Sequence, residues 1–241
     1  MKAFEPIQFP VIGMMHSPFR EKFGIPRQPN LVNIETYIQL CAPYNNISAF
    51  EGIEEFSHLW LLWHFHENKN LNQSSFRPQV RPPRLGGNQR KGVFATRSMY
   101  RPAPIGMSVV QLNRIECVGK ELRVYVMGSD LLHGTPILDI KPYIHYSDAI
   151  DNAQSGYADI QPPIKPVIWS DNASQQCQSL IVDGLTTLKI IESLEQVLAL
   201  DPRPAYQHDE QRLYGMSFDQ LNVQFQVKEE NVFVVSICTV F

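Results

Sequence analysis

Short apolar runs separated by polar and proline-rich stretches make up the first 145 or so residues of the chain. The runs are rich in β-branched and aromatic residues and are bounded by Pro, Gly or Asn, which is the pattern of strands. The predicted strands cover residues 11–15, 58–66, 92–96, 107–112 and 122–127. Since no segment in this region has the 3.6-residue apolar period of a long helix, the pattern predicts an antiparallel barrel or sandwich.

The last third of the chain shows a different pattern. Residues 148–174 are polar and contain Pro and Gly, which indicates a linker with a domain boundary near 155–165. A helix is then predicted from an apolar stripe, expected in the core, that ends at Asp201-Pro202 and consists of Leu185, Leu188, Ile191, Leu194 and Leu198. Apolar residues alternate with polar ones over 221–227 and return over 232–238, so a hairpin is predicted after the helix.

Charge is distributed unevenly along the chain. The whole sequence has a formal net charge of −3, from 21 basic and 24 acidic residues. Residues 68–115 contain no Asp or Glu but nine basic residues, namely Lys69, Arg77, Arg81, Arg84, Arg90, Lys91, Arg97, Arg101 and Arg114. This concentration predicts one positive face on an otherwise acidic protein, and such a face attracts phosphates or another polyanion. A solvated basic loop without a ligand is the alternative.

The sequence shows no sign of a membrane or secretory route. Its longest apolar stretch, residues 59–65, is far shorter than the roughly 20 residues of a membrane-spanning helix. The first residues lack the apolar core and cleavage site of a secretory signal. The four cysteines are scattered singly, without the spacings of a zinc site or a disulfide framework, so we expect them to be reduced and buried. We therefore expect a cytoplasmic protein with no membrane partner.

Three histidines share one side of the strand predicted at 58–66, because side chains alternate along a strand. His64 and His66 form a His-x-His pair that can hold a transition metal when a third ligand approaches, and His133 or His145 could supply it. No third ligand lies at a diagnostic spacing. A hydrogen-bonding or ligand-facing role is therefore favoured over a metal site.

Two loops carry residues suited to binding. Residues 129–136 read Ser-Asp-Leu-Leu-His-Gly-Thr-Pro, and this tight loop offers carbonyls and a carboxylate to a polar or cationic ligand, although a plain turn is the simpler interpretation. Residues 201–206 read Asp-Pro-Arg-Pro-Ala-Tyr, where an arginine beside an aromatic suits an exposed RNA base and its phosphate. The absence of a P-loop, a Rossmann glycine motif and a nucleophile elbow argues against the enzyme classes that use them.

Ordered motifs along nearly the whole chain resemble the TsaA-like family. They are Ile12-Gly13, Ser17-Pro18-Phe19, Pro26-Arg27-Gln28, Glu51-Gly52-Ile53-Glu54, Phe56-Ser57-His58-Leu59-Trp60, Arg81-Pro82-Pro83-Arg84-Leu85-Gly86-Gly87, Gly92-Val93-Phe94-Ala95-Thr96-Arg97-Ser98, Arg101-Pro102-Ala103-Pro104-Ile105-Gly106 and Asp139-Ile140-Lys141-Pro142-Tyr143. The resemblance implies a mainly β protein: a single-sheet antiparallel β-barrel at residues 1–160 and a small α+β C-terminal domain at 161–241 that contributes to tRNA binding. It also implies a homodimer.

The reaction implied by the resemblance is transfer of a methyl group from S-adenosylmethionine to N6 of N6-threonylcarbamoyladenosine, beside the anticodon of a threonine tRNA. The implied cofactor-binding residues are Arg27, Gln28, His66, Arg97, Asp130, Leu131, Leu132, His133, Gly134 and Thr135. Arg97 would pair with the methionine carboxylate or a nearby tRNA phosphate. The implied RNA-binding residues are Arg84, Arg90, Lys91, Arg101 and Arg203. Tyr206 and Asp201, with His66, are the candidates for a proton acceptor, and no metal is expected.

The residue-based interpretation agrees with methyl transfer. In-line displacement at a methyl group mainly requires that donor and acceptor be positioned, so no covalent nucleophile is needed. A modified base in a single-stranded loop is accessible to a protein with a positive surface. Two alternatives stay open: a non-catalytic RNA-binding module that uses the same basic segment, and a metal-dependent β-barrel enzyme centred on His64 and His66.

Overall fold

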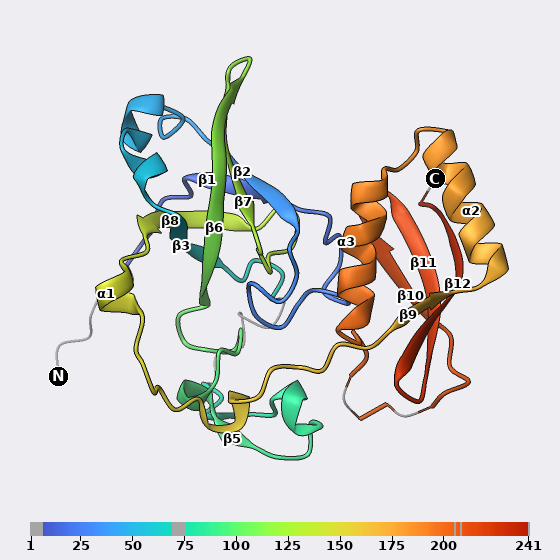
Figure 1. Ribbon diagram of the computed structural model, residues 1–241. Coiled ribbons are helices and arrows are strands. Elements are labelled where there is room, and N and C mark those ends of the chain that lie inside the picture. The colour runs from blue at the N-terminus through green and yellow to red at the C-terminus, as the bar shows by residue number, and fades with distance from the viewer. Residues whose placement is uncertain (1–6, 69–75, 205, 208, 241) are drawn as a thin grey trace.

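The structure is a computed structural model, and it describes residues 7–68, 76–204, 206–207 and 209–240. Figure 1 shows a strand-rich unit at the left and a second unit at the right, in which α3 lies on the side that faces the first. The fold is mainly β, as the strand pattern predicts, with few helices.

Six strands build the first unit: β1 (Gly13–His16), β2 (Glu35–Leu40), β3 (His58–His64), β6 (Ile105–Val118), β7 (Glu121–Met127) and β8 (Pro136–Pro142). They pair in the order β1-β2-β7-β6-β3-β8, and β8 pairs back with β1, so the antiparallel sheet closes into a barrel. Alternate residues point inward, because side chains of a strand lie on opposite faces. Met15, Ile38, Leu59, Val110 and Val124 are among the residues of this core.

A small lobe interrupts the barrel between β3 and β6. We call its described residues, 76–104, the basic lobe, because they contain seven Arg and Lys residues and no Asp or Glu. It holds a two-stranded sheet of β4 (Gln79–Val80) and β5 (Lys91–Gly92) and two 3-10 turns, η3 (Pro83–Leu85) and η4 (Val93–Ala95). In Figure 1 it lies below the barrel. Its many prolines fix φ and limit the ladder hydrogen bonds it can form.

The remaining short elements before the second unit are η1 (Ile47–Phe50), η2 (Ile53–Glu55), α1 (His145–Asp148) and η5 (Gly156–Ala158). The second unit contains β9 (Val167–Trp169), α2 (Asp171–Val182), α3 (Leu188–Ala199), β10 (Tyr214–Phe218), β11 (Leu221–Lys228) and β12 (Asn231–Thr239). Its sheet has the order β10-β11-β12-β9, with β9 parallel to β12. In the part of the chain that the structure describes, no helix combines the length and apolar character needed to span a membrane.

The loop between β1 and β2 belongs to the second hydrophobic core rather than to the barrel. Phe19, Val32 and Ile34 are buried against residues of α3 and the second sheet. Phe19 forms an isolated bridge with Phe218, and a Cβ atom at Gly24, whose φ is +90°, would lie 2.2 Å from the sulfur of Met216. The second unit therefore holds in place the segment that carries Arg27 and Gln28.

Several predicted elements need correction. Residues 92–96 form a 3-10 turn after only two strand residues, because the prolines around them leave no partner strand of useful length. Helix α2 begins inside the predicted linker; its sequence is mostly polar, but Ser170 caps it by accepting a hydrogen bond from the Ala173 N–H at 3.1 Å. Of the predicted helical stripe, Leu185 and Leu188 are exposed and the rest is buried. The expected burial of the four cysteines is also wrong: Cys41 and Cys177 are half-buried, and Cys117 and Cys238 are exposed.

Candidate cofactor and substrate site

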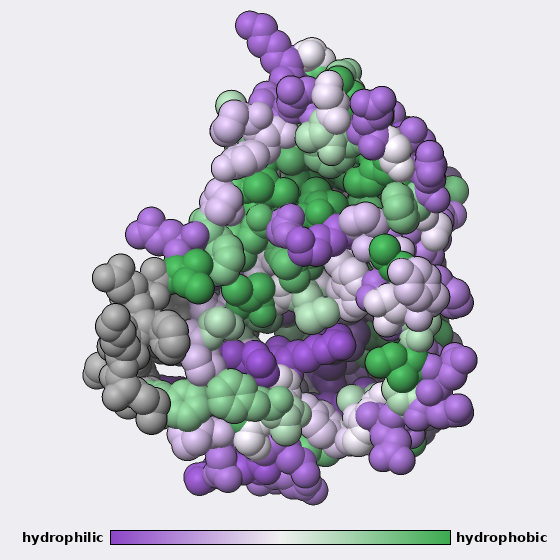
Figure 2. Space-filling model, turned by 90° about the vertical axis from the view of Figure 1, so that its left-hand side faces the viewer, coloured by the Kyte–Doolittle hydropathy of each residue, from purple (hydrophilic) through white to green (hydrophobic). Residues whose placement is uncertain are grey.

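A cavity of about 570 Å³ lies at the end of the barrel where β3 stops and β6 begins. Four segments form its wall: loop residues 22–28, residues 63–68 at the end of β3, residues 94–107 from the basic lobe into β6, and residues 130–135 after β7. Figure 2 shows the face at the left of Figure 1, where apolar side chains gather above an opening crossed by hydrophilic ones. The size is in the range of roughly 300–1,000 Å³ that small-molecule sites occupy.

Cationic side chains form one wall of the cavity. Arg97 Nη1 donates a hydrogen bond to Gln28 Oε1 at 2.6 Å, and Gln28 Nε2 donates to the Arg27 carbonyl at 2.6 Å. Arg27 Nη2 in turn donates to the Arg203 carbonyl at 3.3 Å. Burial lowers the pKa of Arg27, as does the nearby charge of Arg84, whereas Asp201 opposes the shift. The three linked residues present positive charge where an anionic group would enter.

A carboxylate also lines the cavity: Asp130 follows β7 and is partly buried. Ser108 Oγ donates a hydrogen bond to Asp130 Oδ1 at 2.6 Å and accepts one from Trp63 Nε1 at 3.1 Å. Burial raises the pKa of Asp130 to about 6, although Ser108 and the charge of Arg97 oppose the rise. The Trp63 ring lies so close to Gly106 that a Cβ atom there would be 2.3 Å from it, so glycine is needed at that position.

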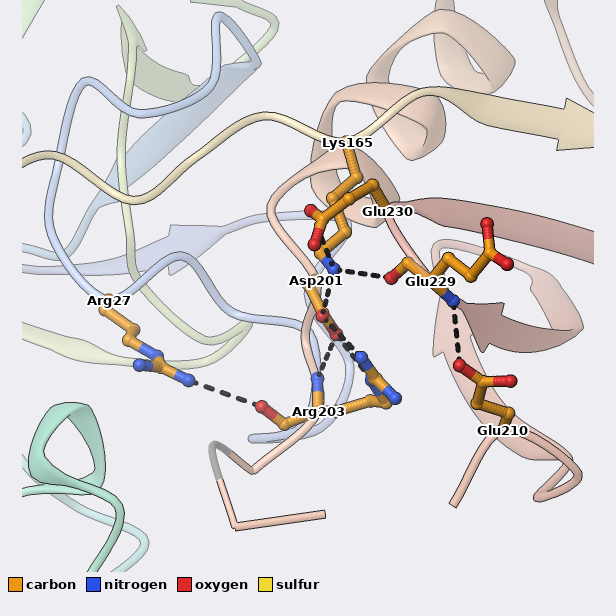
Figure 3. Close-up of polar contacts among 7 residues, drawn as sticks. All are labelled: Arg27, Lys165, Asp201, Arg203, Glu210, Glu229 and Glu230. Atoms are coloured by element: carbon orange, nitrogen blue, oxygen red, sulfur yellow. Dashed lines mark hydrogen bonds and ion pairs between the residues drawn. The ribbon is translucent and has the colours of Figure 1, made fainter. Parts of the chain in front are cut away.

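The loop after α3 approaches the same region from the second unit. Asp201, whose φ is +49°, accepts hydrogen bonds from Arg203 Nε and Nη2, both at 2.8 Å. Figure 3 shows this pair with Lys165 beside it. Burial alone would raise the pKa of Asp201, but its hydrogen bonds with Arg203 and the charges of Arg203 and Lys165 hold it below the ordinary value. Tyr206 is 63% exposed and lies beside Gly87 of the basic lobe.

Most of the cofactor-binding residues inferred from the sequence come together in the cavity. Those in its wall are Arg27, Gln28, His66, Arg97, Asp130, Leu132 and Thr135. Leu131 is instead buried in the barrel core, and His133 faces a separate cavity of about 400 Å³ next to His16. Gly134 has φ +76° and forms the turn, where its N–H bonds the Met15 carbonyl. In so tight a loop neighbouring side chains point in different directions, which sequence adjacency does not reveal.

The RNA-binding residues inferred from the sequence divide into two groups. Arg84, Arg90, Lys91 and Arg101 lie in the basic lobe, and Arg101 also lines the cavity, where its Nη1 donates to the Thr96 carbonyl at 2.9 Å. Arg203 differs, because its side chain is only 10% exposed and both its Nε and Nη2 donate to Asp201. The positive charge of Arg203 therefore stabilises the loop and is not presented to a phosphate.

Not every basic residue of the segment 68–115 contributes to the predicted positive face. Arg114 lies far along β6, donates to Glu35 at 2.9 Å and Glu116 at 2.6 Å, and packs over the Tyr125 ring. Lys69 lies outside the described residues. Within the described part of the segment, the basic lobe contains the remaining seven cations, and Arg97 and Arg101 of this lobe line the cavity.

Several residues of the cavity wall are not among those predicted from the sequence. They include Lys22, Trp63, Phe65, Ile105 and Met107. In strand 58–66 only the histidines were considered as binding residues, yet at the end of this strand the aromatic rings of Trp63 and Phe65 also line the cavity. His64 and His66 both line the wall. Among the described residues, no group of three or more His, Cys, Asp or Glu side chains has the proximity to hold a metal ion.

Comparison with known proteins defines the class. The chain belongs to the tRNA-methyltransferase O (TrmO) family: residues 14–149 match the model of its N-terminal domain and residues 162–240 that of its C-terminal domain.

Individual relatives match over most of their length. The chain is 42% identical to the tRNA (adenine(37)-N6)-methyltransferase of Escherichia coli K12, over 92% of this chain and 94% of that protein. It is 45% identical to a putative S-adenosylmethionine-dependent methyltransferase of Pseudomonas aeruginosa, over 89% of this chain and 90% of the relative. The crystal structure of TrmO from Pseudomonas aeruginosa superimposes with a TM-score of 0.78 at 35% identity, covering 97% of this chain and 99% of that one.

Proposed function

We propose that the chain is an S-adenosylmethionine-dependent tRNA methyltransferase that methylates N6 of N6-threonylcarbamoyladenosine next to the anticodon of threonine tRNA. The observation that carries the proposal is the cavity at the barrel end, whose wall combines Arg27, Arg97 and Asp130 and includes residues of the basic lobe. The names of the E. coli and P. aeruginosa relatives support the same chemistry.

The chemistry of the wall fits the parts of S-adenosylmethionine. Arg97, with Arg27 linked to it through Gln28, suits the methionine carboxylate. Asp130 suits the ribose hydroxyls and the cationic part of the molecule, and the apolar side chains of Trp63 and Leu132 suit the adenine ring. When bound, S-adenosylmethionine supplies an electrophilic methyl group on a positively charged sulfur.

The residues of the chain then have to orient the target nitrogen and remove its proton. The threonylcarbamoyl-bearing N6 is weakly nucleophilic, so a proton acceptor near it assists the displacement. His66 lies in the cavity wall, and burial lowers its pKa. The lowered pKa favours the neutral imidazole, which can accept a proton from the substrate. Tyr206 is the exposed candidate on the loop from the second unit. Asp201 is a weak base, because Arg203 and Lys165 stabilise its charged form.

The basic lobe would hold the anticodon stem and loop. Arg84, Arg90 and Lys91 supply phosphate contacts, and single-stranded loop nucleotides are the RNA context in which a base is exposed to an enzyme. Since Gly87 of the lobe lies beside Tyr206, RNA on this surface is within reach of both units.

The test of the proposed function is methyl transfer by the purified full-length protein. With radiolabelled S-adenosylmethionine, EDTA and threonine tRNA that carries the threonylcarbamoyl group, label is expected in the tRNA, and none is expected in tRNA that lacks this group. Binding of RNA without affinity for S-adenosylmethionine would instead support the RNA-binding module. Loss of transfer in EDTA with recovery on adding a metal would support the metal enzyme.

Affinity for S-adenosylmethionine is expected to depend on the charge of Asp130. Because the pKa of Asp130 is raised to about 6, lowering the pH from 7.5 to 5 protonates it and is expected to weaken binding about 10-fold. Isothermal titration calorimetry across this pH range measures the effect. Asp130→Asn is the control: its affinity at pH 7.5 is expected to equal that of the wild type at pH 5, with a much smaller pH step. An unchanged pH step in Asp130→Asn would contradict the role of Asp130.

The same substitution has a consequence for stability. A carboxyl whose pKa is raised on folding stabilises the folded state only while it is protonated, so the wild type is expected to lose stability as the pH rises from about 4 to 6. Asp130→Asn is expected to keep that stability at pH 7.5, and a higher melting temperature than that of the wild type is the readout.

We also propose a cytoplasmic protein of two domains, with residues 1–160 carrying the cofactor site and residues 161–241 contributing to tRNA binding. The two separate hydrophobic cores support this division, although loop residues from the first part pack in the second core.

We also propose that the protein forms a homodimer. Exposed apolar side chains on and near α1 support it: Ile144 is 37%, Tyr146 89% and Ile150 74% exposed. Apolar surface of this kind commonly marks an interface.

Placing a charge on this surface is expected to separate the subunits. The double substitution Tyr146→Glu and Ile150→Glu would require two carboxylates to be desolvated in the interface, so sedimentation analysis is expected to give half the wild-type mass. Val182→Glu, at a side chain 79% exposed on α2, is the matched control and is expected to leave the mass unchanged. A wild type that sediments as a monomer would contradict the proposed homodimer.

A further inference from the structure

The side chain of Lys165 is largely buried where the linker enters the second unit, and the sequence pattern does not single this residue out. Its side chain is 12% exposed. Lys165 Nζ donates to the Glu229 carbonyl at 3.1 Å and lies 3.6 Å from Asp201 Oδ2 and 3.4 Å from Glu230 Oε2 (Figure 3). Its backbone N–H donates to the carbonyl of Ala199, at the end of α3. One cation thus ties the linker to the end of α3 and to the turn between β11 and β12.

The contacts of Lys165 continue toward the cofactor cavity. Asp201 uses both carboxylate oxygens for Arg203, and this pair closes the turn after α3. The turn presents the Arg203 carbonyl to Arg27 Nη2 at 3.3 Å. Arg27 lines the cavity and is linked through Gln28 to Arg97. A continuous path of polar contacts therefore joins Lys165 to the cationic wall.

We propose that Lys165 is a positioning residue for Arg27 and acts through Asp201 and the carbonyl of Arg203. The inference rests on the proposed function, because Arg27 is taken to hold S-adenosylmethionine. Asp201 has a positive φ, which is unfavourable for a residue with a Cβ atom and persists only where neighbouring contacts maintain it. Lys165 supplies one of those contacts and the counter-charge for Asp201 and Glu230. Without it, the turn loses its fixed conformation and Arg27 loses its acceptor.

The test is the affinity of the full chain for S-adenosylmethionine, measured by titration calorimetry without RNA. Lys165→Met keeps the length of the stem and removes the charge; it is expected to weaken binding about 3- to 10-fold, which lies at the lower end of the couplings found within one hydrogen-bonded network. Lys165→Arg keeps the charge and is expected to remain close to the wild type. Lys228→Met is the matched control, because Lys228 ends β11 next to Glu229 but packs over the Phe233 ring, and it is expected to bind normally. Circular dichroism checks folding, and Lys165→Gln replaces Lys165→Met if the latter is unfolded.

A double-mutant cycle separates positioning from a general structural role. In an Arg27→Lys background, which removes the guanidinium that meets the Arg203 carbonyl, Lys165→Met is expected to weaken binding no further. Equal effects of Lys165→Met in both backgrounds, or wild-type affinity in Lys165→Met alone, would overturn the inference. So would a raised KM for tRNA with unchanged affinity for S-adenosylmethionine, since Lys165 would then act on RNA. If the wild type binds no S-adenosylmethionine, this result contradicts the proposed function itself and therefore also the role of Lys165.

Discussion

Replacing Arg97 by alanine is expected to abolish methyl transfer to threonine tRNA and to weaken S-adenosylmethionine binding about 100-fold. Arg97 lies in the cavity wall, and among the described residues its side chain forms one hydrogen bond, to Gln28, which leaves its other donors available to a ligand. A charge-assisted pair with a carboxylate contributes about 1.5–3 kcal/mol, and 2.7 kcal/mol corresponds to roughly 100-fold in affinity. Calorimetry and a filter assay for labelled tRNA measure the two effects.

A control arginine distinguishes this role from a general loss of charge. Arg212 packs over the Tyr214 ring in the second unit, and Arg212→Ala removes the same charge away from the cavity. Its affinity for S-adenosylmethionine is expected to stay within about twofold of the wild type, the scale of surface substitutions. If Arg97→Ala retains full activity and affinity with its fold intact, Arg97 does not hold the cofactor.

Removing three cations from the basic lobe is expected to separate RNA binding from cofactor binding. In the triple substitution Arg84→Ala, Arg90→Ala and Lys91→Ala, tRNA affinity is expected to fall about 100-fold at moderate salt. The slope of log affinity against log salt should become shallower by about 2, because each phosphate contact to single-stranded RNA contributes about 0.7. Fluorescence anisotropy with labelled tRNA at several salt concentrations measures both quantities.

Cofactor affinity provides the internal check for this triple substitution. None of the three residues is part of the cavity wall, so calorimetry is expected to give wild-type affinity for S-adenosylmethionine. Arg114→Ala is the matched control, since Arg114 belongs to the same acid-free segment but pairs with Glu35 and Glu116. It should leave the salt slope unchanged. A slope that changes in Arg114→Ala and not in the triple variant would place RNA elsewhere.

The sequence was sufficient to predict an element or a surface where one physical signal dominated. In strand β3 the buried residues Leu59 and Leu61 alternate with partly exposed neighbours. This period of two residues predicted a strand. Strand β2 was missed because the inward residue Thr36 interrupts the apolar alternation; it is 2% exposed, and its hydroxyl has no hydrogen-bond partner among the residues that the structure describes. The acid-free segment predicted a basic surface, and its cations from 76 to 104 do share one lobe.

The rest depended on contacts between distant segments. Arg203 looked available for RNA because the sequence shows an arginine between two prolines, whereas the positive φ of Asp201 turns the carboxylate onto it. The burial of Phe19 against Phe218 joins residues about 200 positions apart, and no local pattern encodes such a pairing. The cavity itself combines four segments, which is why its wall could be inferred only in part.

If the cavity beside the basic lobe carries out methyl transfer to one modified adenosine, the nucleosides of threonine tRNA depend on it. Mass spectrometry measures them in a strain that lacks the gene, complemented with either the wild type or Arg97→Ala. The wild type is expected to restore the methylated form of N6-threonylcarbamoyladenosine, and Arg97→Ala to leave only the unmethylated form. A methylated nucleoside that is present without the gene, or that returns fully with Arg97→Ala, would contradict the account.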